Sequence, residues 1–233
     1  MDYDIADLIA GDTPFENCVL SCAPAVRNRV QLGVHGRADL PRRDYRISIP
    51  DPAFRGRLNI RLGPGTGTIE IAGRGAIVAD FRVWRDATVR IGAGTTMNGV
   101  RIVADNADVT IGQDGLWSDE IIVQSNDQHG LIDLTTGAVR NNRRRRMQIG
   151  DHVWIGRRSV LMPDIDIGEG AVVAAGALVT RAVPPRCVAG GNPARVVSEQ
   201  TSWSRQPGGP TEAETSYFGP DWPPQDCPPG QTD

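Results

Sequence analysis

The stretch IGDHVWIGRRSVLMPDIDIGEGAVVAAGALVTRAV, residues 149–183, repeats one pattern every six residues. An aliphatic residue leads each group of six, and a small or branched residue follows it four places later. The leading series is Ile149, Ile155, Leu161, Ile167, Val173 and Val179, and the second series is Val153, Ser159, Ile165, Ala171, Ala177 and Val183. Neither a helix of 3.6 residues per turn nor an alternating strand sustains a step of six. The stretch therefore predicts short strands separated by sharp turns.

A longer repeat lies upstream of this stretch. The phrases GTIEIAG, ATVRIGA and ADVTIGQ begin at residues 67, 87 and 107, which are 20 residues apart. The same step of six runs inside these units, through Ile71, Ile77, Val83, Ile91, Met97, Val103, Ile111, Trp117 and Val123. Three such sides make a coil of about 18 residues, and coils stack at the strand spacing of about 4.8 Å. We predict an all-β fold, a parallel β-helix, whose leading residues point into the prism and whose glycines supply turns.

The flanks of the repeat differ from it in composition. Residues 1–66 lack the repeat until RLNIRLG, and we expect their alternating segments to form strands that cap the open end of the prism. Residues 67–197 form the β-helix domain, with a loop inserted at 126–148. Residues 198–233 are rich in Pro and Gly and predict an irregular tail.

Composition excludes several classes of protein. The formal net charge of −3 gives no reason to expect a nucleic acid or an anionic membrane as partner. No apolar run approaches the roughly 20 residues of a membrane span, and the acidic start MDYDIADLIAGD lacks the features of a signal peptide, so we expect a cytoplasmic protein. The four cysteines are too few for a disulfide framework. Cys18 and Cys22 have no second ligand pair, so we expect buried free thiols and no metal.

The end of the repeat resembles the hexapeptide-repeat acyltransferases. The phrase GNPAR, residues 191–195, is the usual ending in that family, and the resemblance covers about residues 67–197. SNDQHGLIDLTTG, residues 125–137, followed by IGDHVWIG, resembles the branch that O-acetylates capsular and other surface polysaccharides. The resemblance implies a left-handed parallel β-helix, acetyl-CoA as acyl donor, and a homotrimer with its sites between subunits. The chain departs from the family in the returning loop, where Asn141 and Asn142 precede four arginines instead of the common Asn-Pro.

His129 is the candidate catalytic base. Acyl transfer to a hydroxyl needs a base, and histidine titrates in the suitable range. His129 follows EIIVQSN, where the repeat stops, and by resemblance it matches the catalytic histidine of the family. Asp127 lies two residues earlier, so in an extended chain both side chains share a face. Asp127 either orients the ring or holds the acceptor, or it is a turn residue. His152 occupies a slot where outward polar residues are expected, and we expect it on the surface.

The acyl-CoA contacts are inferred from the resemblance by position. The family contacts to the pantetheine and nucleotide correspond to Arg157, Ala175 and Thr180. Arg181 and Arg195 stand where basic residues meet the CoA phosphates, a role that suits arginine, although both also fit a solvated face. Trp154 either walls the thioester channel or packs at a subunit interface.

Two charged or aromatic segments remain. The run Arg143–Arg146 lacks interleaved aromatics, which argues against nucleic-acid binding. We expect an exposed, charged loop, with a basic rim for an anionic acceptor or CoA as the alternative. The tail carries Trp203, Tyr217, Phe218 and Trp222, so we expect it to drape over its own trimer.

The leading functional hypothesis is an acetyl-CoA-dependent O-acetyltransferase that acts on a sugar or polysaccharide. An amino sugar, an antibiotic or another natural product stays open as acceptor. A carbonic anhydrase on the same helix needs three converging histidines, and only His129 and His152 lie in the repeat region. A non-catalytic scaffold would need neither the inserted loop nor the GNPAR ending.

Overall fold

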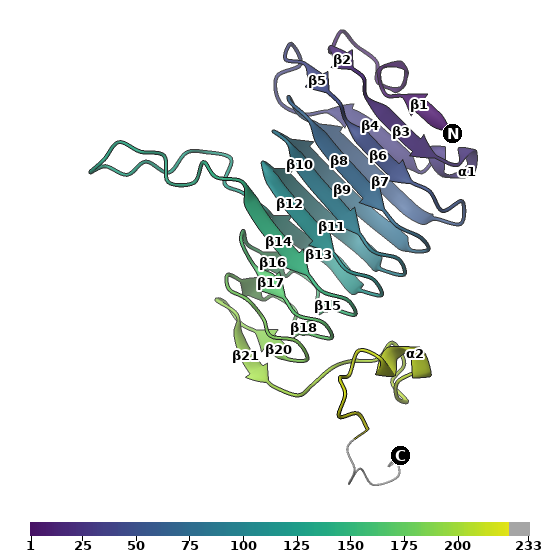
Figure 1. The fold of residues 1–233 in the computed structure, drawn as a ribbon, viewed down its shortest axis with the longest axis vertical. Helices are drawn as coiled ribbons and strands as arrows, with labels where there is room; N and C mark the ends of the chain where they lie inside the picture. The colour runs from purple at the N-terminus through teal and green to yellow at the C-terminus, as the bar shows by residue number, and fades with distance from the viewer. Residues whose placement is uncertain (224–233) are drawn as a thin grey trace.

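The computed structural model describes residues 1–223, and the strands among them build a left-handed parallel β-helix of stacked coils (Figure 1). One side of the prism is an eight-stranded sheet of β1 (Asp2–Asp4), β3 (Val19–Cys22), β6 (Arg46–Ile49), β8 (Gly67–Ile71), β10 (Ala87–Ile91), β12 (Ala107–Ile111), β14 (Arg145–Ile149) and β17 (Asp166–Ile167). The other two sides are an eleven-stranded sheet of β4 (Val30–Val34), β7 (Arg55–Leu62), β9 (Ala76–Trp84), β11 (Thr96–Asp105), β13 (Leu116–Gln124), β15 (Trp154–Ile155), β16 (Val160–Leu161), β18 (Val172–Val173), β19 (Leu178–Val179), β20 (Val188–Gly190) and β21 (Arg195–Ser198).

Few elements lie outside these sheets. Two short strands, β2 (Phe15–Glu16) and β5 (Arg42–Arg43), pair with each other near the N-terminus. The helical segments are each a single turn: η1 (Ala6–Leu8), α1 (Pro24–Arg27) and α2 (Glu212–Thr215). Among the described residues, no helix combines the length and apolar character that a membrane span requires.

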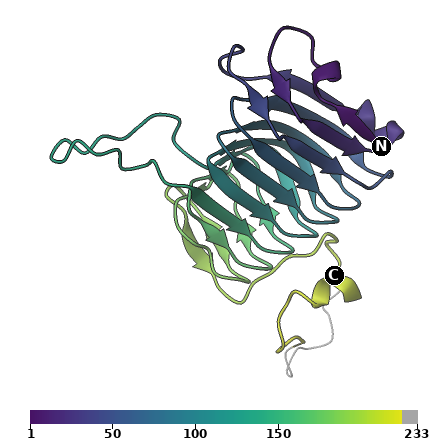
Figure 2. The ribbon, with the colours of Figure 1, turned by 45° about the horizontal axis from the view of Figure 1, so that its top comes forward.

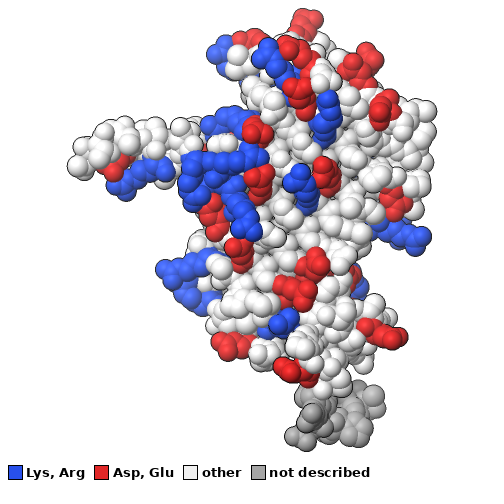
Figure 3. Space-filling model, viewed as in Figure 1, with Lys and Arg blue, Asp and Glu red and all other residues white. Residues whose placement is uncertain are grey.

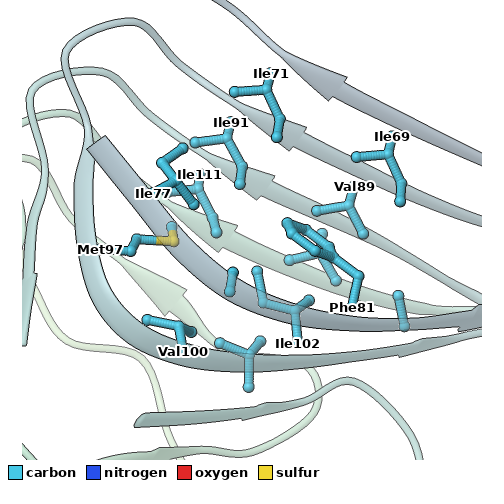
Figure 4. Packing of buried hydrophobic residues seen from close by; sticks show 14 of the residues in the cluster. Ile69, Ile71, Ile77, Phe81, Val89, Ile91, Met97, Val100, Ile102 and Ile111 are labelled. Carbon is cyan, nitrogen blue, oxygen red and sulfur yellow. The ribbon is translucent and has the colours of Figure 1, made fainter. Parts of the chain in front are cut away.

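The step of six places side chains inside the prism as predicted. Ile149 pairs with Ile167 and Leu161 with Val179, so coils in this part advance by 18 residues. Every member of both hexad series is buried, including Ser159, whose hydroxyl donates to the carbonyl of Gly156 at 2.8 Å. Figure 4 shows how equivalent residues of successive coils, such as Ile71, Ile91 and Ile111, stack into one core. The predicted fold class is confirmed.

Three corners join the sides of each coil, and they fix the position of every candidate residue. We call them the first corner (residues 150–153 and 168–171), the second corner (156–159 and 174–177) and the third corner (162–165 and 180–183). The coils approach so closely at the second corner that a Cβ on Gly156 would lie 2.5 Å from the backbone nitrogen of Ala175. Glycine is required there for space.

The coils begin before residue 67. Strand β3 pairs in parallel with β6, and β6 pairs in parallel with β8. In the other sheet β4 pairs in parallel with β7, and β7 with β9, so the segment expected to act as a cap contributes coils of its own. The antiparallel strand β1 closes this end of the eight-stranded sheet.

Arg42 is fully buried near this end and donates to the carbonyl oxygens of Leu62, Arg37 and His35. Cys18 and Cys22 are buried free thiols as predicted, and Cys187 is a third. Burial raises the pKa of each of these thiols. Cys227 lies outside the described residues.

The tail folds back along the axis of the prism. After β21 pairs antiparallel with β20, residues 201–222 run over the first corner from the last coil toward earlier ones; we call them the strap (Figure 2). Thr201 N–H donates to the carbonyl of Arg186, Ser202 Oγ to that of Gly170, and Trp203 Nε1 to that of His152. The part of the tail from residue 224 onward lies outside the described residues.

The strap overturns the expectation that His152 lies on the surface. Its side chain is fully buried, because the rings of Trp203 and Tyr217 cover both faces at centroid distances of 4.2 and 4.7 Å. Its Nδ1 lies 2.8 Å from a carboxylate oxygen of Asp114, and its Nε2 lies 3.0 Å from the carbonyl oxygen of Trp203. The slot does face outward from the coil, but a segment more than 50 residues away covers it.

Candidate functional site

The inserted loop leaves the prism at the third corner, between β13 and β14, and projects far from it (Figure 1). Two residues fix the outgoing chain to the preceding coil. The backbone N–H of Asp105 donates to Ser125 Oγ at 3.0 Å, and Asn126 Nδ2 donates to the carbonyl of Asp105 at 3.2 Å. The carboxylate of Asp105 is itself buried and accepts two hydrogen bonds, at 2.6 and 2.5 Å, from Arg85.

Asn141 fixes the returning chain against the outgoing one. Its Nδ2 donates to the carbonyl of His129 at 2.8 Å and lies 3.5 Å from Oδ2 of Asp127. Its Oδ1 accepts from the backbone N–H of Leu131 at 2.8 Å. Asn141 is 6% exposed, although both neighbouring residues in the chain are exposed. We call residues 125–131 together with Asn141 the neck of the loop.

His129 lies in this neck with an exposed side chain. Within residues 1–223, its ring nitrogens make no hydrogen bond, so the imidazole is open to solvent. Asp127 is half-buried, and no hydrogen bond joins its carboxylate to the imidazole of His129 in the described part of the chain. The proximity of Asp127 to Asn141 is compatible both with a turn residue and with a group that holds an acceptor.

The four consecutive arginines fasten the returning chain to the prism. Arg144 donates to Asp108 at 2.7 Å and to Asp86 at 2.8 Å, and Arg143 and Arg145 both pair with Asp164. Arg144 holds the pKa of the Asp108 carboxyl below its usual range through its hydrogen bond. Figure 3 shows blue side chains gathered at the base of the projecting loop, with red side chains bordering them. Arg143, Arg144 and Arg146 are exposed, as expected for an exposed, charged loop, but aspartates on three different coils pair with Arg143, Arg144 and Arg145.

The residues predicted to contact acyl-CoA fall into two groups. Arg157 and Ala175 lie at the second corner on successive coils, where Gly176 N–H donates to the carbonyl of Arg157 at 2.8 Å. Arg157 is also exposed and pairs with Asp119 at 2.7 Å, which lowers the pKa of that carboxyl. Thr180 and Arg181 are exposed at the third corner, the corner from which the loop leaves.

The remaining two predicted contacts lie elsewhere. Arg195 is exposed at the start of β21, and its guanidinium donates to the neighbouring carbonyl of Ala194. Trp154 points outward from β15, is 39% exposed, and packs against Trp203 with ring centroids 6.1 Å apart. The strap thus provides a wall for Trp154 within its own chain.

A single chain does not bring the two groups together. The second and third corners stand at opposite ends of the side formed by β16 and β19, and six extended residues span about 20 Å. Each of these two corners therefore offers two of the six predicted contacts: Arg157 and Ala175 lie at the second corner, and Thr180 and Arg181 lie at the third corner, from which the neck leaves.

Sequence reasoning missed Asn141, the Asp105–Arg85 pair and the strap. The sequence offers no feature that separates Asn141 from Asn142, because only the folded loop buries one of them. Arg85 and Asp105 are 20 residues apart, the same spacing as the upstream repeat, and this signal could have placed them on neighbouring coils. Among residues 1–223, no three His, Cys, Asp or Glu side chains are grouped as metal ligands.

Comparisons with known proteins agree with the architecture. Residues 146–181 match the family model described as bacterial transferase hexapeptide (six repeats). The chain is 32% identical over 130 residues to the polysialic acid O-acetyltransferase of Escherichia coli O1:K1, covering 55% of this chain and 42% of that protein. It is 31% identical over 120 residues to the galactoside O-acetyltransferase of Escherichia coli K12, covering 48% and 55% of the two chains. The chain thus spans about half the length of these curated relatives.

Two solved structures share the fold over nearly the whole described chain. The polysialic acid-specific acetyltransferase NeuO aligns with a TM-score of 0.73 and 24% identity, covering 91% of this chain and 97% of that one. The polysialic acid O-acetyltransferase OatWY aligns with a TM-score of 0.63 and 21% identity, covering 90% and 98%. Together with the hexad periodicity and the stacked coils, these matches show that residues 146–181 are a hexapeptide repeat of the bacterial transferase type and that the chain has the β-helix fold of the two solved structures.

Proposed function

We propose that this protein transfers an acetyl group from acetyl-CoA to a hydroxyl of a saccharide, with His129 as general base. The observation that carries the proposal is the neck: hydrogen bonds fix the main chain around His129 while its imidazole stays exposed and unpaired among the described residues. A general base must be held in place and must also be open to its substrate. The third corner adds Thr180 and Arg181 as exposed polar groups near the exit of the loop.

The reaction follows from the chemistry of the imidazole. Neutral His129 accepts the proton of the acceptor hydroxyl as the oxygen attacks the thioester carbonyl, and a tetrahedral intermediate forms. The intermediate collapses with cleavage of the C–S bond, and the CoA thiolate takes the proton back from the imidazolium. Acetyl ester and CoA are the products, so atoms and charge balance. A base placed in this way contributes about 10²–10⁴-fold to the rate.

The acceptor class follows from the relatives. Both curated relatives described above are named as O-acetyltransferases of saccharides, one of polysialic acid and one of galactosides. We infer a saccharide acceptor for this chain and choose a sialic acid polymer as the first compound to test. Arg181 and Arg195 are exposed, and neither forms an ion pair among the described residues, so both are available to CoA phosphates.

The site is proposed to form between copies of the chain in a homotrimer. The loop carries four exposed apolar side chains, Leu131, Ile132, Leu134 and Val139, on a segment that projects away from its own prism (Figure 2). Apolar surface of this kind favours a covering partner. A head-to-tail ring of identical chains would set the third corner of one copy beside the second corner of the next, which would unite the two groups of predicted acyl-CoA contacts.

The test measures CoA release with a thiol reagent, using acetyl-CoA, polysialic acid and a panel of hydroxyl and amine acceptors. His129→Ala is compared with Gln128→Ala, which alters an exposed neighbour in the same neck. We expect His129→Ala to lower kcat at least about 100-fold and Gln128→Ala to leave it unchanged. Full activity in His129→Ala would disprove its role as base, and transfer confined to amine acceptors would disprove the O-acetyl assignment. Light scattering of the purified protein tests the trimer.

A further inference from the structure

We propose that Asn141 is a positioning residue for His129: it sets the place of the imidazole by locking the two chains of the neck together. The inference rests on the proposed role of His129 as base. It concerns a residue from the far end of the inserted loop, 12 positions after the base, whose buried side chain faces the outgoing chain.

One carboxamide contacts three alternate residues of the outgoing chain. Nδ2 donates to the carbonyl of His129 at 2.8 Å, Oδ1 accepts from Leu131 N–H at 2.8 Å, and Nδ2 lies 3.5 Å from the carboxylate of Asp127. The first bond holds the carbonyl of His129 itself, and the second holds the backbone N–H of Leu131, two residues later. Together they fix the main chain immediately after the imidazole. A shift of the chain by one residue would leave this buried carboxamide unpaired, and leaving such a group unpaired is costly. Asn141 thereby selects one register for the neck.

The chemistry of the side chain is specific to asparagine. The neck needs a donor toward the His129 carbonyl and an acceptor toward the Leu131 N–H, and a neutral carboxamide supplies both. Aspartate has nearly the same shape but offers no donor, and it would set a second carboxylate near Asp127. Alanine offers neither group. Asn142 is exposed and makes no side-chain hydrogen bond within residues 1–223, so the adjacent asparagine cannot replace Asn141.

His129 lies between Asn141 and a second, separate anchor. On the side of the prism, Ser125 and Asn126 bind the main chain of Asp105. Beyond the neck, the outer part of the loop closes on itself through the Ile132–Val139 bridge and the Asp133–Arg140 pair. Loss of Asn141 would leave both of these connections intact. We therefore expect a folded protein in which the neck is mobile around His129, because regions with few contacts open independently of the core.

The experiment compares Asn141→Asp, which is nearly isosteric, with the matched control Asn142→Asp. We expect Asn141→Asp to lower kcat about 10–100-fold with little change in KM for acetyl-CoA, because a misplacement of about 1 Å is enough for such a loss. Amide hydrogen exchange of residues 127–131 should quicken in Asn141→Asp, while exchange of the β-helix strands stays as in the wild type. Asn141→Ala should show the same two effects, since it removes the donor without adding a charge.

A double variant separates positioning from an independent role. If Asn141 acts through His129, then His129→Ala/Asn141→Asp has the activity of His129→Ala alone. Two results would overturn the positioning role and leave the proposed function in place. One is a double variant with lower activity than His129→Ala alone. The other is wild-type kcat in Asn141→Asp while His129→Ala is inactive. Full activity of His129→Ala would instead disprove His129 as the general base, and the proposed role of Asn141 would fail with it.

Discussion

The indole of Trp203 lies parallel to the imidazole of His152, with ring centroids 4.2 Å apart and 7° between the ring planes. Each side chain also reaches the main chain of the other residue: Trp203 Nε1 donates to the carbonyl of His152 at 2.8 Å, and His152 Nε2 lies 3.0 Å from the carbonyl oxygen of Trp203. Arg205, two residues further along the strap, binds Asp114 on the preceding coil at 2.9 Å. The strap is therefore attached to the prism by specific polar contacts as well as by stacked rings.

Replacement of Trp203 by alanine should release the strap. The side chain is 6% exposed, and loss of a buried tryptophan costs about 3–5 kcal/mol, which we expect to exceed the docking energy of a short segment. Trypsin should then cleave after Arg205 at least about tenfold faster than in the wild type, because the scissile chain must open locally for cleavage. Trp222→Ala is the control, since Trp222 is 42% exposed. Equal cleavage of the two variants would show that the His152 contact does not hold the strap.

Acid should weaken the strap through Glu214. Burial opposes ionisation of this carboxyl, but hydrogen bonds from Arg205 N–H, Thr211 N–H and the Thr211 and Ser204 hydroxyls outweigh it and lower its pKa to about 2, against an ordinary value of 4.5. A lowered pKa in the folded state stabilises docking above about pH 4.5, and this stabilisation is lost as the pH falls toward about 2. Urea titrations of tryptophan fluorescence should separate wild type from Glu214→Gln at pH 6 and show the difference closing by about pH 2–3. A pH-independent difference would rule out this linkage.

A methyl group on Gly156 should disturb the stacking of coils. The new Cβ would lie 2.5 Å from the nitrogen of Ala175, and backbone atoms cannot yield as a flexible side chain can. We expect Gly156→Ala to reduce the free energy of unfolding by about 2 kcal/mol or more. Gly33→Ala, where nothing lies within 4 Å of the added Cβ, should change it by less than about 0.5 kcal/mol. Urea denaturation followed by circular dichroism measures both, and equal stability of the two variants would contradict the close approach.

The Asp105–Arg85 pair should matter more than an exposed pair with similar geometry. Asp105 is fully buried, so Asp105→Ala removes a bidentate contact from the coil that anchors the neck, at a cost of about 3 kcal/mol. Glu70 and Arg90 also lie 2.7 Å apart on neighbouring coils, but about half of each side chain is exposed. Glu70→Ala should therefore cost about 1 kcal/mol or less in the same denaturation experiment. A similar loss for both variants would mean that burial of Asp105 adds nothing.

The sequence predicted the fold because its information is local and repeated. Each leading residue, from Ile71 to Val179, occupies an equivalent position in a coil, so the period alone assigns its side chain to the interior. The same logic failed for His152, because a periodic pattern describes the coil and not the distant segment that covers it. It also missed the N-terminal coils, where β6 and β7 pair with the stack although the step of six is not visible in their sequence.

The candidate site was predictable in part. The end of the repeat singles out His129 in the sequence, and the loop that carries it leaves the prism at the third corner, the corner at which Thr180 and Arg181 lie on a later coil. The catalytic role of His129 stays a prediction. The hydrogen bonds of Asn141 were not predictable, because they depend on how a long insertion closes on itself. The Arg143–Arg146 run shows a related limit: composition reports four charges, but only the stacking of coils reveals the aspartates that meet them.

The strap also changes how such a stack should come apart. In a repeat protein each coil contacts only its neighbours, so the terminal coil is expected to unfold first and the others to follow one after another. Here the chain beyond the last coil returns to Gly170, His152 and Asp114, and Arg205 also reaches the carbonyl of Gly94. The final coils cannot fray without first detaching a segment bound to coils much earlier in the sequence. The C-terminal half of the prism should therefore unfold as one cooperative block. Unfolding should not begin at the C-terminal coils, which carry the predicted acyl-CoA contacts.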